Sequence, residues 1–335
     1  MKIAILTPTF NYFSGIDRVV QLQAEEYAKK GNKVTVIALQ AKIRPDKYNI
    51  IELGMPKSEF WQRIYRLFFF FDSKKMGCYK RLKGYDVVIS HFYPMNWLAY
   101  EAKKKFGIKY VYWDHGINTI GLLDSFIQKL YMQLFLLFNN ITLKNIDEAY
   151  SVSKCLSSQL WKESRIRSKV VYNKIDKKRF NIGVKGDKII SRYNLKNKKI
   201  LLYVGRIAPH KGIHLLLDAF KIIKKSIPTA KLIIAGKTTF SSYFKKLRKT
   251  ADKEVIFTGF VGDNDLPHYY AACDLYVTCS QWEGFNLPAA EAQACGKKVV
   301  AFDIGSHREI VKKGILVKKN DINAFAEAAI KVLAE

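Results

Sequence analysis

Two basic residues, Arg206 and Lys211, lie five positions apart in a segment that reads as the connection between a strand and a helix. An apolar run, Lys199–Val204, precedes them, Gly205 can turn the chain, and a helix is expected from about residue 212. Both cations therefore lie at the carboxyl edge of the expected sheet. Two cations there could clamp a diphosphate and neutralise the charge that develops on it as it leaves. The alternative is an ordinary solvated loop.

Two carboxylates follow a later strand, Asp274–Thr278. Glu283 lies in the loop, and Glu291 comes after seven intervening residues, about one turn into a helix. Asn286 is expected to be the N-cap of that helix, with Pro288 in its first turn. The N–H groups at a helix start favour an anion or sugar hydroxyls. Since a carboxylate accepts two hydrogen bonds from a vicinal diol, each Glu could hold one ring of a nucleotide sugar.

This Glu-(seven residues)-Glu spacing resembles the motif of family 4 retaining glycosyltransferases (glycosyl transferase group 1). That family has the GT-B fold, in which two Rossmann-like domains face each other across a cleft. The resemblance implies that Glu283 lies near the donor sugar and that Glu291 binds the donor ribose. Arg206 and Lys211 match the diphosphate-binding pair of the family, and the segment Gly305–Val311 (GSHREIV) also agrees with it.

The resemblance further implies that backbone amides at the start of the helix meet the sugar or the diphosphate. These are the amides of Phe285, Asn286 and Leu287. The family usually has glycine where this chain has Asn286, which leaves the donor more open. It implies no required metal and no cofactor, because the nucleotide-diphosphate sugar is a co-substrate.

The first half of the chain gives a partial match. The family has a glycine-rich loop after its first strand, often with two glycines, and here only Gly15 is present, followed by Arg18, which could reach a phosphate. His115, in Tyr112–Ile117 (YWDHGI), follows a strand and corresponds to a family histidine near the donor sugar. A histidine at such a place is more often structural, but beside the other matches we expect it to be catalytic, together with Glu283 and the two cations.

Short apolar runs alternate with amphipathic stretches throughout, which indicates parallel sheets covered by helices. The first half has expected strands at Ile3–Leu6, Val34–Leu39, Asp86–Ser90, Lys109–Tyr112 and Ala149–Val152. The rhythm restarts at Lys199–Val204 and continues with Lys231–Ala235, Glu254–Thr258, Asp274–Thr278 and Lys298–Phe302. We therefore expect an acceptor-binding domain over residues 1–172 and a donor-binding domain over 173–335, with a linker at about 173–197.

Composition limits the partners. The 335 residues carry 57 Lys+Arg against 29 Asp+Glu, a formal net charge of +28 that is spread over both halves. Such a balance favours nucleotide phosphates, an anionic membrane surface or nucleic acid. Nucleic acid is not expected, because its binding requires a concentrated basic face or aromatic stacking platforms. The five cysteines form no Cys-x-x-Cys pair, and reduced thiols fit a cytoplasmic protein.

Two apolar segments, Ile64–Phe71 and Leu130–Leu143, are too short to span a bilayer and are expected to be mainly buried helices. The wider segment Trp61–Lys83 interleaves aromatic and basic residues, with Asp72 as its one acid. Such a segment binds anionic membrane surfaces, or else is a helix with its apolar face inward. The first alternative predicts peripheral attachment to the inner face of the membrane and a lipid-linked acceptor.

Asp263-Asn264-Asp265 has the form of a metal-binding Asp-x-Asp triplet, but it reads better as a loop that caps the helix Leu266–Ala272. No Gly-x-Gly-x-x-Gly follows the first strand, which disfavours nicotinamide and flavin cofactors, and no phosphate-loop lysine motif is present.

The sequence thus predicts transfer of a hexose, with retention at the anomeric carbon, from a UDP- or GDP-linked sugar to a hydroxyl of a glycan or lipid-linked glycan. A nucleotide-sugar epimerase or a phosphorylase of the same fold remains an alternative. The first would act without an acceptor, and the second would need free phosphate or a bound cofactor. A nucleic-acid-binding protein is a third, weaker alternative.

Overall fold

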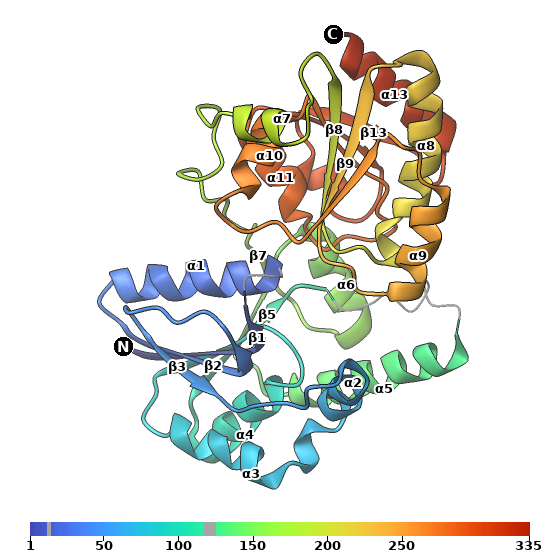
Figure 1. Ribbon diagram of the computed structural model, residues 1–335. Helices are drawn as coiled ribbons and strands as arrows, with labels where there is room; N and C mark the ends of the chain where they lie inside the picture. Colours follow the sequence, from blue (N-terminus) through green and yellow to red (C-terminus); the bar gives the residue numbers. More distant parts are fainter. Residues whose placement is uncertain (12–14, 117–124) are drawn as a thin grey trace. The chain divides into compact units, whose positions relative to one another are not determined.

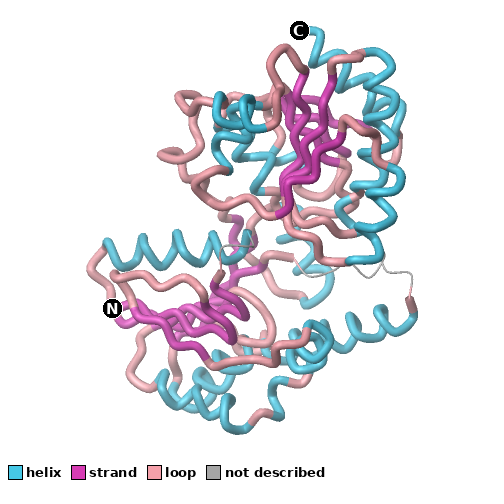
Figure 2. The backbone as a smooth tube through the Cα atoms, viewed as in Figure 1, coloured by secondary structure: helices cyan, strands magenta, loops and turns pink. Residues whose placement is uncertain are grey.

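The computed structural model describes residues 1–11, 15–116 and 125–335. The chain divides into two compact units, Met1–Lys174 and Ile175–Glu335, and each is an α/β domain with a parallel sheet (Figures 1 and 2). Each domain is described by itself below.

The sheet of the first domain has the strand order β3-β2-β1-β4-β5-β6-β7. Its strands are β1 (Lys2–Phe10), β2 (Lys33–Ala41), β3 (Asn49–Glu52), β4 (Val87–Ser90), β5 (Lys109–Asp114), β6 (Glu148–Ser151) and β7 (Lys169–Val170). Its helices are α1 (Gly15–Lys29), α2 (Glu59–Leu67), α3 (Ser73–Met76), α4 (Asn96–Phe106), α5 (Phe126–Thr142) and α6 (Lys154–Ser164), with 3-10 turns η1 (Phe69–Phe71) and η2 (Gly77–Leu82).

Helices cover both faces of this sheet, which explains why its central strands are continuous apolar runs. Along β1 and β2 almost every side chain is buried. Val20 and Ala24 of α1 pack with Ile5 and Val36 on one face. On the other face, residues of α4 such as Leu98 belong to a second core. The alternation of strands and helices seen in the sequence is therefore confirmed.

The second domain repeats the plan with the strand order β10-β9-β8-β11-β12-β13. Its strands are β8 (Lys199–Val204), β9 (Ala230–Ala235), β10 (Val255–Gly259), β11 (Leu275–Thr278), β12 (Lys298–Phe302) and β13 (Gly314–Val317). Its helices are α7 (Asp187–Arg192), α8 (Ile213–Ser226), α9 (Ser241–Thr250), α10 (Leu266–Ala272), α11 (Leu287–Ala294), α12 (His307–Ile310) and α13 (Ile322–Ala334), with the 3-10 turn η4 (Pro209–Lys211).

This sheet also has two cores. Phe220 of α8 and Phe325 of α13 lie in one core, and Tyr270 of α10 and Ala289 of α11 lie in the other (Figure 1). In both domains the first strand has the second strand on one side and the fourth on the other. The strand order reverses between the first strand and the fourth, so the loops that leave their carboxyl ends turn to opposite faces of the sheet. Ligands of doubly wound sheets bind at such a point.

Of the linker expected at about 173–197, residues 175–197 belong to the second domain. They include α7, and their buried side chains Phe180, Ile189 and Leu195 contribute to its core. These apolar residues are too far apart to give a helical or strand period, but each fills a place in the core. The short edge strands β3, β7 and β13 are not among the strands expected from the sequence.

The helix α5 differs from the expectation of a buried helix. Phe135 is buried, but Phe126 is 78% exposed, Ile127 77% and Leu137 55%. Among the described residues no helix is long and apolar enough to cross a membrane. The five cysteines are all free thiols, four of them buried.

Candidate active site

Two loops of the second domain are held together by their backbones. Gly212, the N-cap of α8, has φ 64°, and a Cβ at this position would come 2.0 Å from the carbonyl oxygen of Cys279, just after β11. Gln281 N–H donates to the carbonyl of His210 at 2.8 Å. Only glycine allows this close approach at a left-handed φ. This close approach places Lys211, at the end of the loop that follows β8, against the loop that follows β11.

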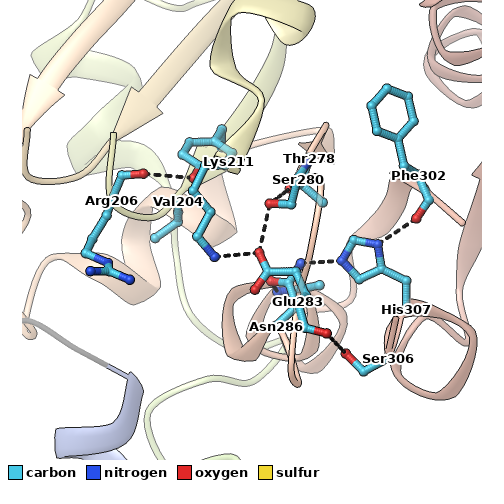
Figure 3. A network of polar contacts seen from close by, with 12 residues as sticks. Val204, Arg206, Lys211, Thr278, Ser280, Glu283, Asn286, Phe302, Ser306 and His307 are labelled. Atoms are coloured by element: carbon cyan, nitrogen blue, oxygen red, sulfur yellow. Dashed lines mark hydrogen bonds and ion pairs between the residues drawn. The ribbon is translucent and has the colours of Figure 1, made fainter. Parts of the chain in front are cut away.

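Lys211 forms an ion pair with Glu283, a direct contact that the sequence does not predict. Lys211 Nζ lies 2.7 Å from Glu283 Oε1, and the two side chains are 16% and 11% exposed (Figure 3). Ser280 Oγ donates to the same carboxylate oxygen at 2.8 Å. The lysine and the carboxylate therefore lie at one point on the carboxyl edge of neighbouring strands.

Glu283 is held in its charged form. Burial would raise the pKa of this carboxyl, but the charge of Lys211 and the hydrogen bonds from Lys211 and Ser280 outweigh it, so the pKa lies below its ordinary value. Glu283 is thus a carboxylate at neutral pH. The backbone around it is anchored as well, because Ser306 Oγ donates to the Glu283 carbonyl at 3.2 Å.

Arg206 comes from the same loop as Lys211 but is arranged differently. Its side chain is exposed and turns away from Glu283 (Figure 3). Its backbone carbonyl accepts a hydrogen bond from Tyr203 Oη at 3.2 Å, which fixes the turn after β8. The loop therefore carries one cation paired with a buried carboxylate and one directed outward.

Asn286 is the N-cap of α11, as the sequence predicts, and has the left-handed φ and ψ of 67° and 66°. Its Oδ1 accepts from the N–H of Ala289 at 3.2 Å, and its Nδ2 lies 2.8 Å from His307 Nε2 (Figure 3). His307 Nδ1 lies 2.6 Å from the carbonyl of Phe302, which only accepts, so Nδ1 carries the proton. Burial lowers the pKa of His307, and the neutral ring accepts at Nε2 from Asn286.

The other predicted residues of this loop and helix have mainly buried side chains. Phe285 is 7% exposed, Leu287 9% and Glu291 8%. Tyr270 Oη donates to Glu291 Oε2 at 2.8 Å, which fixes the carboxylate on the first turns of α11. The first N–H groups of an α-helix lack partners within the helix, so this end offers donors to an anion.

In the first domain, Gly15 and Arg18 begin α1, after the first strand as predicted. Residues 12–14 of the predicted glycine loop and Ile117 of YWDHGI lie outside the described residues. His115 directly follows β5, and Asp114 Oδ1 accepts from the N–H of Gly116 at 2.9 Å. Burial raises the pKa of Asp114 to about 7 and lowers that of His115 to about 3.

The triplet at residues 263–265 precedes α10, but it does not cap the helix as expected. Asp265 occupies the N-cap position and makes no side-chain cap. Its carboxylate instead accepts from Lys188 Nζ at 2.6 Å and from Arg192 Nη1 at 3.1 Å. The two cations of α7 compete successfully for the carboxylate because charge-assisted hydrogen bonds are stronger than neutral ones.

Three side chains that support the predicted residues are not among those predicted from the sequence. Ser280 binds Glu283, His307 binds Asn286, and His91, after β4, lies 2.9 Å from His115 through ring nitrogens. One signal was present for His91, because both histidines follow apolar strands whose carboxyl ends lie at one sheet edge. The other two contacts depend on loop conformations that spacing does not indicate.

Known proteins match both halves of the chain. The model of glycosyltransferase family 4 matches residues 13–179, and that of glycosyl transferases group 1 matches residues 186–335. An uncharacterized glycosyltransferase of Methanocaldococcus jannaschii is 28% identical over 259 residues, which are 75% of this chain and 66% of that protein. The O-antigen chain mannosyltransferase B of Escherichia coli is 30% identical over 152 residues, 44% of this chain and 40% of that protein. The chain thus spans less than two thirds of these relatives' lengths.

Solved structures share the fold over nearly the whole chain. The sucrose-phosphate synthase of Thermosynechococcus elongatus has a TM-score of 0.84 at 22% identity, with coverage of 100% of this chain and 90% of that one. Anabaena HepE in complex with UDP-glucose has a TM-score of 0.75 at 18% identity, covering 100% and 94%. With two Rossmann-like parallel sheets and family models over both halves, the chain belongs to glycosyltransferase family 4, group 1, and has the GT-B fold.

Proposed function

We propose that the protein is a retaining, metal-independent glycosyltransferase that moves a hexose from a UDP- or GDP-linked sugar to a hydroxyl of a glycan or lipid-linked glycan. The observation that carries this proposal is the Lys211–Glu283 ion pair, whose nitrogen and oxygen are 2.7 Å apart beside the start of α11. Family membership supports the transfer of a sugar from a nucleotide donor. The second domain would bind the donor and the first domain the acceptor.

The two cations have the leading role in this mechanism. As the glycosidic bond of the donor breaks, negative charge develops on the departing diphosphate, and the Lys211 ammonium and the Arg206 guanidinium stabilise it. The N–H groups of Phe285, Asn286 and Leu287 add partial positive charge at the helix start. No divalent cation is then required to neutralise the leaving group.

Lys211 must exchange partners when the donor binds. In the structure its ammonium contacts Glu283, which is charged at neutral pH. A diphosphate carries more negative charge than one carboxylate, so it draws Lys211 away. Glu283, released from the lysine, can accept hydrogen bonds from hydroxyls of the transferred sugar, and Glu291 from those of the ribose. In the first domain, His115 would contact the transferred sugar. Arg18 and the backbone at Gly15 would contact the phosphates of the donor.

Binding of the nucleotide is the first test. We expect UDP or GDP, and the matching sugar nucleotide, to raise the melting temperature of the protein, because a ligand that binds the folded state stabilises it. ADP and its sugars serve as comparison. A protein indifferent to every nucleoside diphosphate would contradict the proposal. Turnover that needs no acceptor, or that needs free phosphate, would instead indicate the epimerase or the phosphorylase.

A second part of the proposal concerns an aromatic surface of the first domain, formed by α2, η1 and α5. Its exposed apolar side chains are Phe60, Trp61, Phe68, Phe71, Phe126, Ile127, Leu130 and Leu137. The helices pack together, since Tyr131 Oη of α5 donates to the carbonyl of Arg63 in α2 and Phe138 contacts the ring of Phe68.

We propose that this aromatic surface contacts an anionic membrane. The same segments, with the turn before α2 and the helix α3, also carry exposed cations, among them Lys57, Arg63, Lys74 and Lys129. Aromatic side chains insert at the boundary between the lipid headgroups and the acyl chains. Each nearby basic residue adds about 1 kcal/mol of attraction to anionic lipid. This arrangement would place the protein on the cytoplasmic face of a membrane and suits a lipid-linked acceptor.

A further inference from the structure

His115 is joined to two other side chains of the first domain. His91 Nδ1 lies 2.9 Å from His115 Nε2, and His91 Nε2 lies 2.7 Å from Gln23 Oε1. The three residues come from α1, from the end of β4 and from the end of β5. They form a continuous chain of hydrogen bonds at the carboxyl edge of the sheet.

The central member of this chain is held rigidly. His91 is fully buried, and its ring lies nearly parallel to that of Trp113, at an interplanar angle of 18°. The ring of His115 is close to coplanar with it, at 23°, as expected for an edge-to-edge hydrogen bond. Trp113 in turn stacks on Tyr150, with ring centroids 5.0 Å apart. Because the ring is buried and packs against Trp113, His91 keeps its two nitrogens directed at Gln23 and His115.

The positions of the protons follow from the partners. Burial lowers the pKa of both histidines, so each ring is neutral at neutral pH and carries one N–H. The amide oxygen of Gln23 accepts, so His91 donates from Nε2 and has a lone pair at Nδ1. His115 must then donate from Nε2 to His91, and its own lone pair lies at Nδ1.

We propose that His91 and Gln23 are positioning residues that fix His115 as the Nε2–H tautomer, so that its Nδ1 accepts a hydrogen bond from a hydroxyl of the sugar substrate. A partner on one ring nitrogen decides which tautomer the other presents. The inference rests on the proposed function, in which His115 meets the transferred sugar. A purely structural role would make His91 a satisfied core histidine, without any effect on the tautomer of His115.

Nuclear magnetic resonance of the full chain with ¹⁵N-labelled histidine tests the tautomer without any substrate. The six histidines give six ring patterns, and substitution of His91 or His115 assigns their own. We expect His115 to show a protonated Nε2 and an unprotonated Nδ1 at pH 7.5. A protonated Nδ1, or an average of both tautomers, would overturn the proposal.

Two variants of His91 separate positioning from packing. His91→Asn keeps an acceptor, because Asn Oδ1 is as many bonds from Cα as His Nδ1, whereas His91→Leu keeps bulk but offers no acceptor. We expect His91→Leu to mix the tautomers of His115 and to lower kcat by about 10- to 100-fold, as with other partners that orient a functional histidine. KM for the donor should change much less, and His91→Asn should restore most of the activity.

The assay is release of UDP from UDP-glucose or of GDP from GDP-mannose, whichever nucleotide stabilises the protein. If His115→Ala keeps full activity, the role given to His115 in the proposed function is wrong, whatever its tautomer. If His115→Ala is inactive while folded His91→Leu is fully active with an unchanged His115 tautomer, the positioning role is wrong and the proposed function stands. Equal losses in His91→Asn and His91→Leu would also refute positioning.

Discussion

At the scale of single residues, the second domain holds a charged pair in nearly buried surroundings. Such pairs seldom contribute much net stability, because removing two charges from water costs about as much as their attraction returns. We therefore explain the Lys211–Glu283 pair by the role of both side chains in donor binding, and not by a contribution to the stability of the fold. The pair holds a lysine next to a carboxylate that stays charged, close to the start of α11.

Removal of the lysine tests this explanation. We expect Lys211→Ala to lower kcat by about 100- to 1000-fold, the range for loss of one group that stabilises a developing charge. Nucleotide release from the sugar donor is the measurement, made on protein whose melting curve shows that it is folded. Lys225→Ala, on the exposed side of the neighbouring helix α8, is the control and should keep full activity. Activity in Lys211→Ala equal to that of the control would rule out the role of Lys211.

Asp114 supplies a test by pH. Burial raises its folded pKa to about 7, above the ordinary value of 3.8, so the folded state binds the proton more tightly than the unfolded chain. The contribution of this tighter proton binding to the free energy of unfolding is fully present below pH 3.8 and is lost as the pH rises towards 7. Between pH 5 and 6.5 the native protein should lose about 2 kcal/mol of unfolding free energy through this group.

Asp114→Asn should not show that loss, because asparagine does not titrate and its Oδ1 can still accept from the N–H of Gly116. Urea denaturation of both proteins at the two pH values measures the difference. His91 and His115 titrate with the opposite sign but are common to both proteins, so they cancel. Parallel pH dependences in the native protein and the variant would contradict the raised pKa.

At the scale of elements, loop backbones decide which side chains meet. Lys211 reaches Glu283 because the N-cap of α8 lies against the strand end of β11, and this contact is possible only with Gly212. In the first domain α1, β4 and β5 bring Gln23, His91 and His115 together in the same way. Neighbouring strands of a parallel sheet thus bring residues that are far apart in sequence together at one site.

A substitution at Gly212 tests the contact. In Gly212→Ala the new Cβ would lie 2.0 Å from the carbonyl oxygen of Cys279, and the left-handed φ of 64° adds about 1 kcal/mol of strain. We expect a lower melting temperature and, since Lys211 moves with the loop, lower activity as well. Gly262→Ala is the matched control, because a Cβ there meets nothing within 4 Å. If both variants behave alike, the close approach does not position Lys211.

Much of this arrangement could be predicted from the sequence. The parts that could not be predicted share physical causes. Buried parallel strands are continuous apolar runs, so β1, β2, β8 and β12 were found, as was the N-cap Asn286. The edge strands β3 and β13 are short and only partly buried, which leaves little pattern. The contacts of Ser280, His91 and His307 depend on loop geometry and on pairs far apart in sequence, which a local pattern does not contain.

At the scale of the whole molecule, the excess of positive charge and the aromatic surface act together. A net charge of +28 attracts the chain to any anionic surface, and this attraction alone is not selective. The exposed rings of α2, η1 and α5 add an apolar contact at one place on the first domain. Charge would bring the protein to the membrane, and the rings would set which face meets it.

Vesicle binding tests this combination. We expect the protein to sediment with phosphatidylglycerol vesicles and much less with phosphatidylcholine vesicles, and salt should weaken the binding by screening. The double variant Trp61→Ser/Phe71→Ser should bind several times more weakly, since two side chains 58% and 75% exposed lose their membrane contact. Trp161→Ser, which alters a partly exposed ring on α6, is the control. An equal effect of both variants, or no binding to either lipid, would contradict the membrane proposal.

A crystal structure of the protein with UDP-glucose or GDP-mannose would show directly where the diphosphate of the donor binds. We predict a diphosphate within hydrogen-bond distance of Lys211 and Arg206 at the start of α11, with Glu283 released from the lysine and directed at the sugar. A donor bound at another place, with the Lys211–Glu283 pair intact, would contradict the account.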